Sequence, residues 1–475
     1  MIKNFKNLRV TIMGLGLHGG GIGAVEFLAG EGAKVLVTDL KAPDRLASSL
    51  RRLAKYRDIK FILGQHRSED FTKADLIIKN PAVNPQSRYL ELARKNKIPI
   101  ETDMGIFIEL CPCPIIGVTG SKGKSTTAAL VYKLFSSKID KICLAGNIRV
   151  SVLSKLKELT KKSLCILELS SWQLDDMILH KRSPCVAIVL NLIPDHLNRY
   201  QNFQAYVEAK KHIFYYQTKK DILILNFDDP IVKSFSEEAK SQVIFFGKNL
   251  TGKIPQNQIG AYLKDNELYF RNETEPIMKL EEIVLKGEHN IYNILAALTL
   301  AKIYHLSDNL INRSLKNFVP LEGRIEFIKE AEGIKFYNDT SATIPDAVMA
   351  AIKSFPDTKN IVLISGGEDK ELDYSDLAKT IVKRVKKLIL LKGSASDKII
   401  RELKELLGSD AKYVKLVAGD NLTDMKEVVK LAMDFCAKGD IILLSPGAAS
   451  FNLFDNEFDR GDQFKRAVKE IVIRT

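Results

Sequence analysis

Long apolar runs are missing from this chain of 475 residues. No stretch of about eighteen apolar residues occurs, so we expect no membrane-spanning helix. Residues 1–7 lead straight into a strand-like segment, so we expect no signal peptide. Short-period repeats and low-complexity tracts are missing too, which argues against a solenoid or a disordered chain. With 45% hydrophobic residues, the chain can build two to four domains with cores of their own.

Cysteine is scarce and scattered. The six cysteines include one close pair, Cys111 and Cys113, in a proline-containing connector, and no second pair has zinc-site spacing. This pattern predicts a reduced, cytoplasmic enzyme. The formal net charge is +13, but the lysines are spread along the chain and no basic block is interleaved with aromatic residues. We therefore expect small polyanionic substrates, no nucleic-acid partner, no membrane insertion and a monomer.

The segment over residues 115–127 is the most informative part of the sequence. A short apolar strand runs into G-V-T-G-S-K-G-K-S-T (residues 117–126), and a helix-like run follows over residues 128–135. Glycines let backbone N–H groups approach phosphates, a lysine reaches the terminal phosphates and a hydroxyl reaches Mg²⁺. Val118 stands where the strict pattern has glycine. The combination still predicts a site for a nucleoside triphosphate rather than a plain turn.

The N-terminal part alternates strand-like and helix-like segments. Residues 8–13, 34–38 and 74–79 read as strands, a glycine run follows the first, and Asp39 ends the second. This is the pattern of a Rossmann-like, doubly wound sheet. Taken alone, the glycine run suggests NAD, but the same geometry serves any nucleotide-linked pyrophosphate. Both ligands stay open at this point.

Two further alternations follow along the chain. Strands are predicted at residues 164–169, 186–190 and 221–225, strands and loops at 247–282, and strands again at 361–365, 387–391 and 440–444. We predict an α/β protein of three domains. They are an N-terminal Rossmann-like domain (residues 1–103), a central P-loop ATPase-like domain with a parallel sheet (104–320) and a C-terminal Rossmann-like domain (321–475).

Polar residues stand where predicted strands of the central segment end. Glu168 ends one strand beside the phosphate loop, where a magnesium ligand belongs. Asp195 and His196 follow another strand, and histidine can bind a metal or a phosphate. The alternatives are an ordinary strand-end glutamate and a solvated loop histidine.

Three side chains lie in helical patterns, and the sequence indicates their roles less clearly. Lys210 has the surroundings of a surface lysine. Asn290 and Asn293 are three residues apart, so they share one helix face and suit hydrogen bonds to a purine ring. Helix capping by Asn290 is a compatible alternative.

Three polar or glycine-rich segments follow predicted strands in the last part of the chain. They cover residues 338–343, 366–370 and 445–454. Turn formation would explain each one singly. Three such exits from one sheet predict a binding face.

The order of these motifs resembles the Mur ligases, ATP-dependent enzymes that add amino acids to the muramoyl peptide of peptidoglycan. The phosphate loop is followed by E-L-S-S-W-Q-L, N-L-I-P-D-H-L-N-R-Y, E-A-K-K-H, G-E-H-N-I-Y-N, E-G-R, N-D-T-S-A-T and L-L-S-P-G-A-A-S. Within the family, the N-terminal G-L-G-L-H-G and the S-G-G-E-D-K segment are most similar to members that add D-glutamate to UDP-N-acetylmuramoyl-L-alanine. The D-N-P-R motif of the diaminopimelate- or lysine-adding members does not occur.

The resemblance implies a role for each matching residue. Catalysis would rest on Lys124, His196 and Lys210, with Lys210 carbamylated by CO₂. Two magnesium sites would be held by Ser125, Glu168, His196 and Lys210. ATP would be bound by Gly117, Thr119, Gly120, Ser121, Lys122, Gly123, Lys124, Ser125, Thr126, Asn290, Asn293, Arg324 and Asp339. The UDP-linked substrate would meet Leu17, His18, Asp39, Asn80 and Asn147. The glutamate pocket would be shaped by Thr343, Lys370, Ser450 and Phe451.

The chain departs from the family pattern at three positions. Ser341 stands where many glutamate-adding members have lysine, His18 where a small hydroxyl residue is common, and Ala82 where glycine is common. A ligase for another amino acid, such as L-glutamate, is therefore one alternative. An NAD-dependent dehydrogenase and a non-catalytic nucleotide-binding regulator are two others, although the first leaves the Lys124 loop unexplained.

Overall fold

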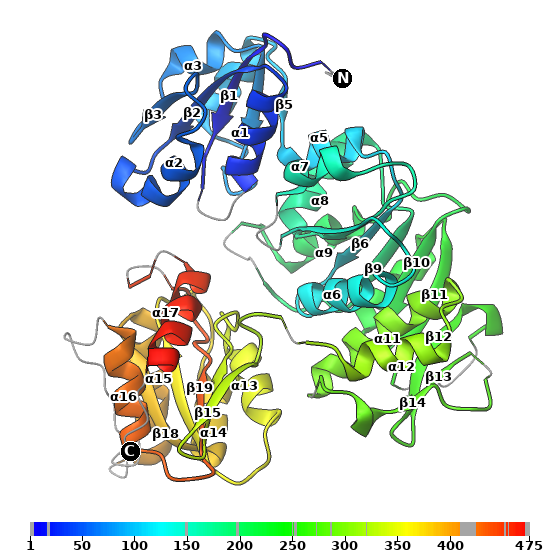
Figure 1. Cartoon of the computed structure of the whole chain (residues 1–475), viewed down its shortest axis with the longest axis vertical. Helices are drawn as coiled ribbons and strands as arrows, with labels where there is room; N and C mark the ends of the chain where they lie inside the picture. Colours follow the sequence, from blue (N-terminus) through cyan, green and yellow to red (C-terminus); the bar gives the residue numbers. More distant parts are fainter. Residues whose placement is uncertain are drawn as a thin grey trace. The chain divides into compact units, whose positions relative to one another are not determined.

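The structure is a computed structural model of the chain (Figure 1). It describes residues 4–16, 20–147, 151–195, 199–248, 250, 254–271, 273–285, 287–319, 321–408, 424–450, 453–454 and 456–470. Within these residues the strands form three sheets of five, nine and five strands. No helix in the described ranges combines the length and apolar character needed to cross a membrane.

The first sheet is parallel and has the strand order β3-β2-β1-β4-β5. Its strands are β1 (Arg9–Met13), β2 (Lys34–Asp39), β3 (Lys60–Leu63), β4 (Leu76–Lys79) and β5 (Ile100–Glu101). Its helices are α1 (Gly20–Gly30), α2 (Ala47–Leu53), α3 (Ser68–Thr72) and α4 (Arg88–Lys95). Val10 and Ile12 pack in the cluster of α1, whereas Ile77 packs in that of α3 and α4. Helices on both faces confirm the doubly wound prediction.

The second sheet has the order β14-β13-β12-β11-β10-β9-β6-β8-β7. Its strands are β6 (Ile115–Thr119), β7 (Ile142–Gly146), β8 (Leu164–Glu168), β9 (Val186–Val189), β10 (Ile222–Asn226), β11 (Gln242–Gly247), β12 (Ile259–Lys264), β13 (Glu267–Phe270) and β14 (Met278–Lys279). The pairs from β7 to β12 are parallel, and those from β12 to β14 antiparallel. Accompanying helices are α5 (Asp103–Leu110), α6 (Lys124–Phe135), α7 (Val152–Lys155), α8 (Ser171–Met177), α9 (Phe203–Lys211), α10 (Pro230–Ser234), α11 (Glu288–Ile303) and α12 (Asp308–Lys316).

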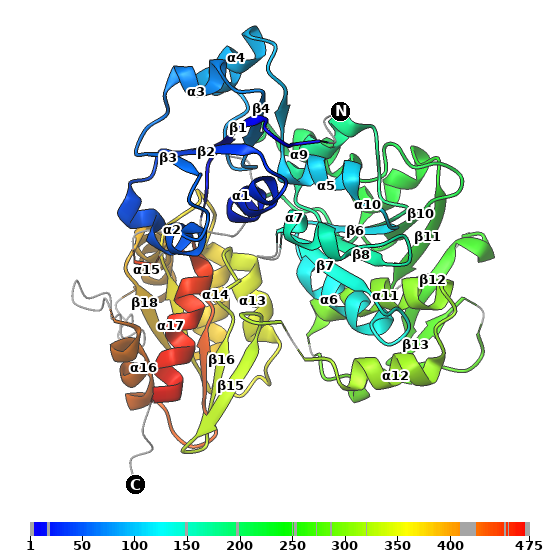
Figure 2. The ribbon, with the colours of Figure 1, turned by 45° about the horizontal axis from the view of Figure 1, so that its top comes forward.

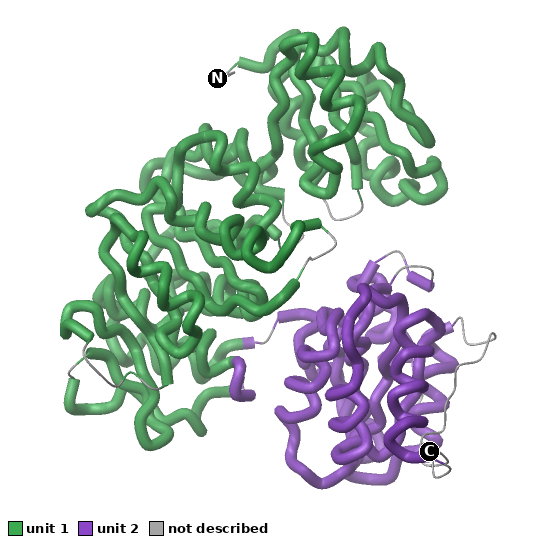
Figure 3. The backbone as a smooth tube through the Cα atoms, turned by 180° about the vertical axis from the view of Figure 1, so that it is seen from behind, with its two compact units in different colours: residues 1–284, 290–318 green, residues 285–289, 319–475 purple. Residues whose placement is uncertain are grey.

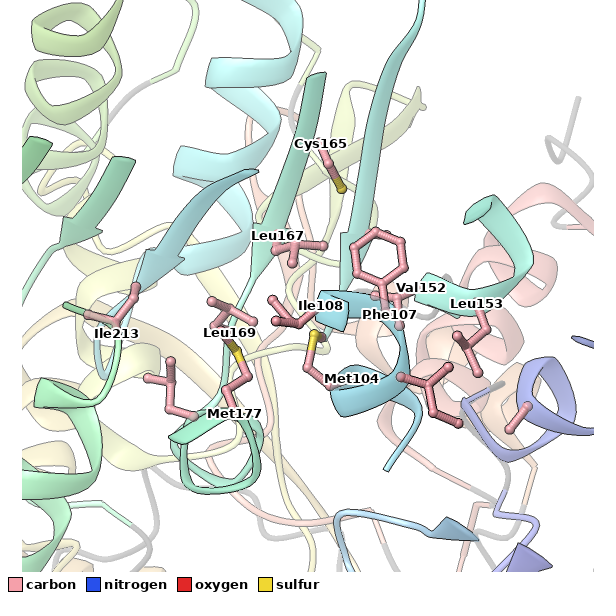
Figure 4. Close-up of a cluster of buried hydrophobic side chains, with 14 of the residues drawn as sticks. Met104, Phe107, Ile108, Val152, Leu153, Cys165, Leu167, Leu169, Met177 and Ile213 are labelled. Carbon is pink, nitrogen blue, oxygen red and sulfur yellow. The ribbon is translucent and has the colours of Figure 1, made fainter. Parts of the chain in front are cut away.

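One buried apolar cluster runs through the first two sheets. It joins Val10 of β1 and Val25 of α1 to Leu167 of β8 and Val189 of β9. Figure 4 shows side chains of α5 and α7, among them Phe107 and Val152, beside the β8 strand that carries Leu167. The apolar side chains of these two short helices therefore belong to the core that the first two sheets share.

The third sheet has the order β15-β16-β19-β17-β18, with only the β15–β16 pair antiparallel. Its strands are β15 (Glu326–Ala331), β16 (Ile334–Asn338), β17 (Ile361–Gly366), β18 (Val385–Leu391) and β19 (Ile441–Leu444). Its helices are α13 (Pro345–Lys353), α14 (Ser375–Arg384), α15 (Ser394–Leu407), α16 (Met425–Asp434) and α17 (Glu457–Glu470), which can be followed in Figure 2. Leu363 packs toward α13, α14 and α15, and its neighbour Ile364 toward α16 and α17. This alternation is the period-two pattern of a strand covered on both faces.

The chain divides into two compact units (Figure 3). Unit 1 consists of residues 1–284 and 290–318 and holds the first two sheets, and unit 2 consists of residues 285–289 and 319–475 and holds the third. The predicted α/β class is confirmed. The predicted domain boundaries at residues 103 and 320 stay predictions.

Shortening a side chain in the shared core of unit 1 should destabilise the chain. Leu167 is fully buried between α5, α7 and the sheet. We expect Leu167→Ala to lower the free energy of unfolding by about 2–5 kcal/mol, because it leaves a cavity. Leu179→Ala is the matched control, since Leu179 is 74% exposed. Equal urea midpoints for the two variants would contradict this account of the core.

Candidate active site

The phosphate loop connects β6 to α6, and its backbone needs glycine at two points. Gly120 has φ +150° and Gly123, the N-cap of α6, has φ +85°. A Cβ at Gly123 would lie 2.1 Å from Asn293 Oδ1, and one at Gly120 would lie 3.0 Å from Leu190 Cβ. Lys124, Ser125 and Thr126 then form the first turn of the helix. The loop therefore presents its amides at a helix N-terminus, as an anion site requires.

Asn191, two residues after the end of β9, holds the loop in shape. Its Oδ1 accepts from Lys122 N at 2.8 Å, and its Nδ2 donates to Lys122 O at 3.0 Å. Its own carbonyl accepts from Ser121 N at 2.8 Å. Ser121 Oγ lies 3.0 Å from both Ile193 O and the Tyr206 hydroxyl. This clamp was not predicted from the sequence. The position of a polar residue, Asn191, just after a predicted strand could have suggested it.

Two lysines meet at the loop. Lys124 Nζ donates to Gly120 O at 3.0 Å and to Ser121 O at 2.9 Å. Lys210 Nζ, from α9, donates to Gly120 O at 3.1 Å and to Thr119 Oγ1 at 3.0 Å. The sequence interpretation of Lys210 as a surface lysine is wrong, because the side chain folds under the loop and the residue is 1% exposed. The helical pattern could not reveal which face of α9 packs inward.

Burial lowers the pKa of the Lys210 amine well below its ordinary value, and the nearby charge of Lys124 lowers it further. Asp195, Glu168 and Asp175 oppose this shift with smaller effects. The uncharged amine is the nucleophilic form of lysine. The buried site of Lys210 thus disfavours the charged form that a surface ion pair would need.

Glu168 lies at the end of β8 and is 2% exposed. Its Oε1 accepts from Asn147 Nδ2 at 3.0 Å, whereas its Oε2 is buried and has no hydrogen-bond partner among the described residues. A buried carboxylate oxygen without a partner is costly unless a cation or donor satisfies it. Ser125 is also buried, in the first turn of α6. This donor set fits a hard divalent cation.

Asn290 and Asn293 hydrogen bond within the protein. Asn293 Nδ2 donates to Asn290 Oδ1 at 2.9 Å, and Asn293 Oδ1 accepts from Thr127 Oγ1 at 3.1 Å. They therefore tie α11 to α6 beside the loop. Their predicted contact with adenine stays a prediction.

The glycine turn after β1 is shaped by Asp39. Its Oδ2 accepts from Leu15 N at 2.8 Å and from Gly16 N at 3.3 Å. Asn80 lies close by, because a Cβ at Gly14 would be 3.0 Å from Asn80 Cβ. The predicted nucleotide-linked residues Asp39 and Asn80 thus meet at one edge of the first sheet, whereas Asn147 lies against Glu168 in the second sheet.

In unit 2, the three predicted strand exits do lie together. Ser445 Oγ donates to Asp339 Oδ2 at 2.7 Å, and Gly366 N donates to Pro446 O at 2.8 Å. Burial raises the pKa of Asp339 to about 7, although Ser445 and the nearby Arg324 oppose the shift. The segments after β16, β17 and β19 lie together because these strands are parallel neighbours, so their carboxyl ends are at the same edge of the sheet.

The residues predicted for the amino-acid pocket are partly brought together. Lys370 Nζ donates to Thr343 Oγ1 at 3.2 Å. Ser450 is buried in the segment after β19, which pairs through Ala449 with Glu368. Ser341 N donates to Gly323 O at 3.0 Å. A hydroxyl and a cation thus share one edge of the third sheet.

Four predicted site residues lie outside the described residues: Leu17, His18, His196 and Phe451. A further residue, Arg460 of α17, was not predicted. Its buried guanidinium donates to Thr340 O at 3.0 Å and to Ala448 O at 3.3 Å, which joins the exits of β16 and β19. The sequence shows Arg460 only as a charged residue in a helical pattern, and such residues usually lie on the surface.

Family models match the chain in three consecutive segments. They are the Mur ligase MurD-like N-terminal domain (residues 8–102), the Mur ligase middle domain (118–301) and the Mur ligase glutamate ligase domain (323–447). A UDP-N-acetylmuramoylalanine–D-glutamate ligase from Roseiflexus sp. (strain RS-1) is 40% identical, over 98% of this chain and 99% of that protein. The chain belongs to the Mur ligase family. A second protein of that name, from Borreliella afzelii (strain PKo), is also 40% identical, and the match covers 98% of the present chain and 99% of the Borreliella protein.

Solved structures agree with the fold of this Mur ligase. A UDP-N-acetylmuramate–alanine ligase from Thermotoga maritima superimposes with a TM-score of 0.66 at 18% identity, covering 98% of this chain and 99% of that one. A MurF structure from Acinetobacter baumannii gives a TM-score of 0.61 at 16% identity, covering 99% and 92%. The dehydrogenase alternative is wrong, because the glycine turn after β1 belongs to a Mur ligase N-terminal domain.

Adding one methyl group at the phosphate loop should disable nucleotide binding. We expect Gly123→Ala to weaken ATP binding at least about tenfold, because the new Cβ would collide with Asn293 and φ is positive. Gly64→Ala is the matched control, with φ +79° and no neighbour within 4 Å. Calorimetric titration with Mg-ATP measures both. Equal dissociation constants for the two variants would contradict the steric account of the loop.

Proposed function

We propose that this chain joins D-glutamate to UDP-N-acetylmuramoyl-L-alanine in peptidoglycan synthesis, using ATP. The observation that carries the proposal is the 40% identity, over nearly the whole of both chains, to ligases of that name. The matching glutamate ligase domain model over residues 323–447 supports the same substrate. Mur ligases use ATP and Mg²⁺, and both suit the site in unit 1.

The phosphate loop would bind the ATP phosphates. Its amides point out at the N-terminus of α6, and Lys124 lies across the loop carbonyls of Gly120 and Ser121. When ATP enters, Lys124 would exchange these carbonyls for phosphate oxygens, which are stronger, charged acceptors. The Asn191 clamp keeps the loop ready, so little reorganisation accompanies binding.

Ser125 and Glu168 would hold a magnesium ion, as Glu168 Oε2 suggests, because it has no hydrogen-bond partner in the described part of the chain. Bound Mg²⁺ would neutralise charge on the phosphoryl oxygens during transfer. Asn147 would fix the rotamer of Glu168 through its hydrogen bond to Oε1. His196 is proposed as a further ligand on the family pattern alone.

Lys210 would act as a carbamate. The buried, uncharged amine can attack CO₂, and loss of a proton leaves an anionic carbamate on Nζ. The new negative charge would face Lys124, which now lowers the pKa of the amine by repulsion. Carbamylation would therefore replace an uncharged amine by an anion that forms a favourable ion pair with Lys124.

The reaction would proceed through an acyl phosphate. The L-alanyl carboxylate of the substrate attacks the γ-phosphorus of ATP, and ADP leaves. The glutamate amine then attacks the acyl carbon, and phosphate departs from the tetrahedral intermediate. A carboxylate is a poor electrophile, so phosphorylation supplies a leaving group. Lys124 and the loop amides stabilise the charge that develops on the phosphoryl group.

Unit 1 would also hold the UDP-linked substrate, at the edge formed by Asp39, Asn80 and the glycine turn. Unit 2 would hold glutamate through Thr343, Lys370, Ser450 and Phe451. Arg324 and Asp339 are proposed as ATP ligands on the family pattern alone. Lys370 carries the positive charge that pairs with a carboxylate. With Ser341 in place of the common lysine, Lys370 would bear more of this recognition.

The substrate assignment is tested by phosphate release. Mg-ATP and UDP-N-acetylmuramoyl-L-alanine should release phosphate with D-glutamate at least about tenfold faster than with L-glutamate, because only one stereoisomer aligns its amine. Lys124→Ala should release none, as the negative control. Release with L-glutamate alone would overturn the D-glutamate assignment. ATP binding without release with either isomer would favour the regulator.

The Lys210 assignment is tested by chemical rescue. We expect Lys210→Ala to lose at least about a hundredfold in turnover and to recover partly with short carboxylic acids, which replace the missing anion. Lys211→Ala is the matched control, since Lys211 is the next residue along α9 and pairs with the exposed carboxylates of Glu208 and Glu238. A ¹³C carbamate resonance after addition of labelled bicarbonate should appear in wild type only. Full activity of Lys210→Ala without rescue would discard the carbamate.

A further inference from the structure

Four of the six cysteines gather where the chain passes from α5 into β6. This thiol cluster consists of Cys111, Cys113, Cys143 and Cys165. Cys111 is the C-cap of α5, and Cys113 follows it in the connector. Cys143 of β7 and Cys165 of β8 are register partners in adjacent strands. Residues from three separate segments thus bring their sulfur atoms to one place outside the ligand sites.

The contacts connect the four sulfurs in a row. Cys111 Sγ lies 3.6 Å from Cys113 Sγ. Cys165 is the register partner of Cys143, and both Cys111 and Cys143 lie close enough to raise its pKa. Cys113, Cys143 and Cys165 are buried, and Cys111 is partly exposed. A reagent that arrives from solvent therefore meets Cys111 first.

Cys111 also has the surroundings of a reactive thiol. Hydrogen bonds from Cys113 and Cys165 stabilise its thiolate and lower its pKa, against the effect of burial. The two cysteines outside the cluster differ, because burial raises the pKa of Cys185 and raises that of Cys436 to about 12. Since the thiolate is the nucleophile, oxidation should favour Cys111.

We propose that Cys111 and Cys113 form an oxidation site for peroxides, with Cys111 as the attacking thiol and Cys113 as the resolving thiol. The Cys111 thiolate attacks one peroxide oxygen, so an S–O bond forms, the O–O bond breaks and the released hydroxide is protonated to water. Cys113 sulfur then attacks Cys111 sulfur, so the S–S bond forms and the S–O bond breaks. The second hydroxide leaves as water with the Cys113 proton. Two thiols lose two electrons, and hydrogen peroxide gains them.

The geometry favours Cys113 as the partner over Cys165. The first pair needs only to close from 3.6 Å to a bond of about 2.05 Å, within the one short connector between α5 and β6. Cys165 is held in β8, between β6 and β7, where its backbone N–H donates to Pro114 O at 3.0 Å. A disulfide at the connector would protect Cys111 from irreversible oxidation and could be reopened by thiols.

Peptide mass mapping of the full chain tests this proposal independently of ligase activity. Trypsin releases Cys111 and Cys113 in one peptide, residues 98–122, and Cys165 in another, residues 163–181. After limited hydrogen peroxide, we expect the first peptide to be lighter by two hydrogen atoms and to regain them with dithiothreitol. Cys111 should be modified at least about tenfold faster than Cys185 or Cys436.

Two variants make the outcome decisive. Cys113→Ser should leave a sulfenic acid at Cys111 that dimedone traps, whereas Cys436→Ser should oxidise at the connector as wild type does. A cross-link between residues 98–122 and 163–181 would overturn the assignment of Cys113. Faster oxidation of Cys185 or Cys436 would overturn the site altogether, and the wild-type map alone is enough to reveal either result.

Discussion

The pairing of β6 with β8 on one side and β9 on the other decides where the chemistry of unit 1 can lie. All three strands run in the same direction, so their carboxyl ends open at one edge. The phosphate loop follows β6, Glu168 ends β8, and Asn191 follows β9. Residues separated by many positions in the chain thus become neighbours through register alone. A slip in either pairing would separate the loop from its clamp and from the carboxylate.

Charge is the second constraint on this edge. Lys124 and Lys210 both reach the loop carbonyl of Gly120, and burial, followed by the charge of Lys124, lowers the pKa of the Lys210 amine. The same logic operates in unit 2, where burial keeps the Asp339 carboxyl protonated to higher pH than usual. The thiol cluster shows the same effect at sulfur, since Cys113 and Cys165 lower the pKa of Cys111. In each case, burial and the neighbouring groups that the fold places around the side chain determine its pKa.

Local pattern predicted much of the fold. The strands over β1, β2, β4 and β8 were found because buried parallel strands read as short apolar runs ended by polar or glycine residues. The short strands β3 and β5 were not found, since their apolar runs are too short: Lys60 begins β3 and Glu101 ends β5. The phosphate loop was found because its glycines, lysine and hydroxyl must be adjacent in sequence to surround a phosphate.

The sequence by itself determined the α/β class, the family and the position of the phosphate loop, because these depend on residues close together in the chain. Only the tertiary structure decided that Lys210 is buried under the loop, that Asn191 clamps Lys122, and that Asn293 closes on Gly123. It also decided that Cys165 meets Cys111. These contacts depend on which helix face turns inward and which strands pair, and both are set by packing across distant segments.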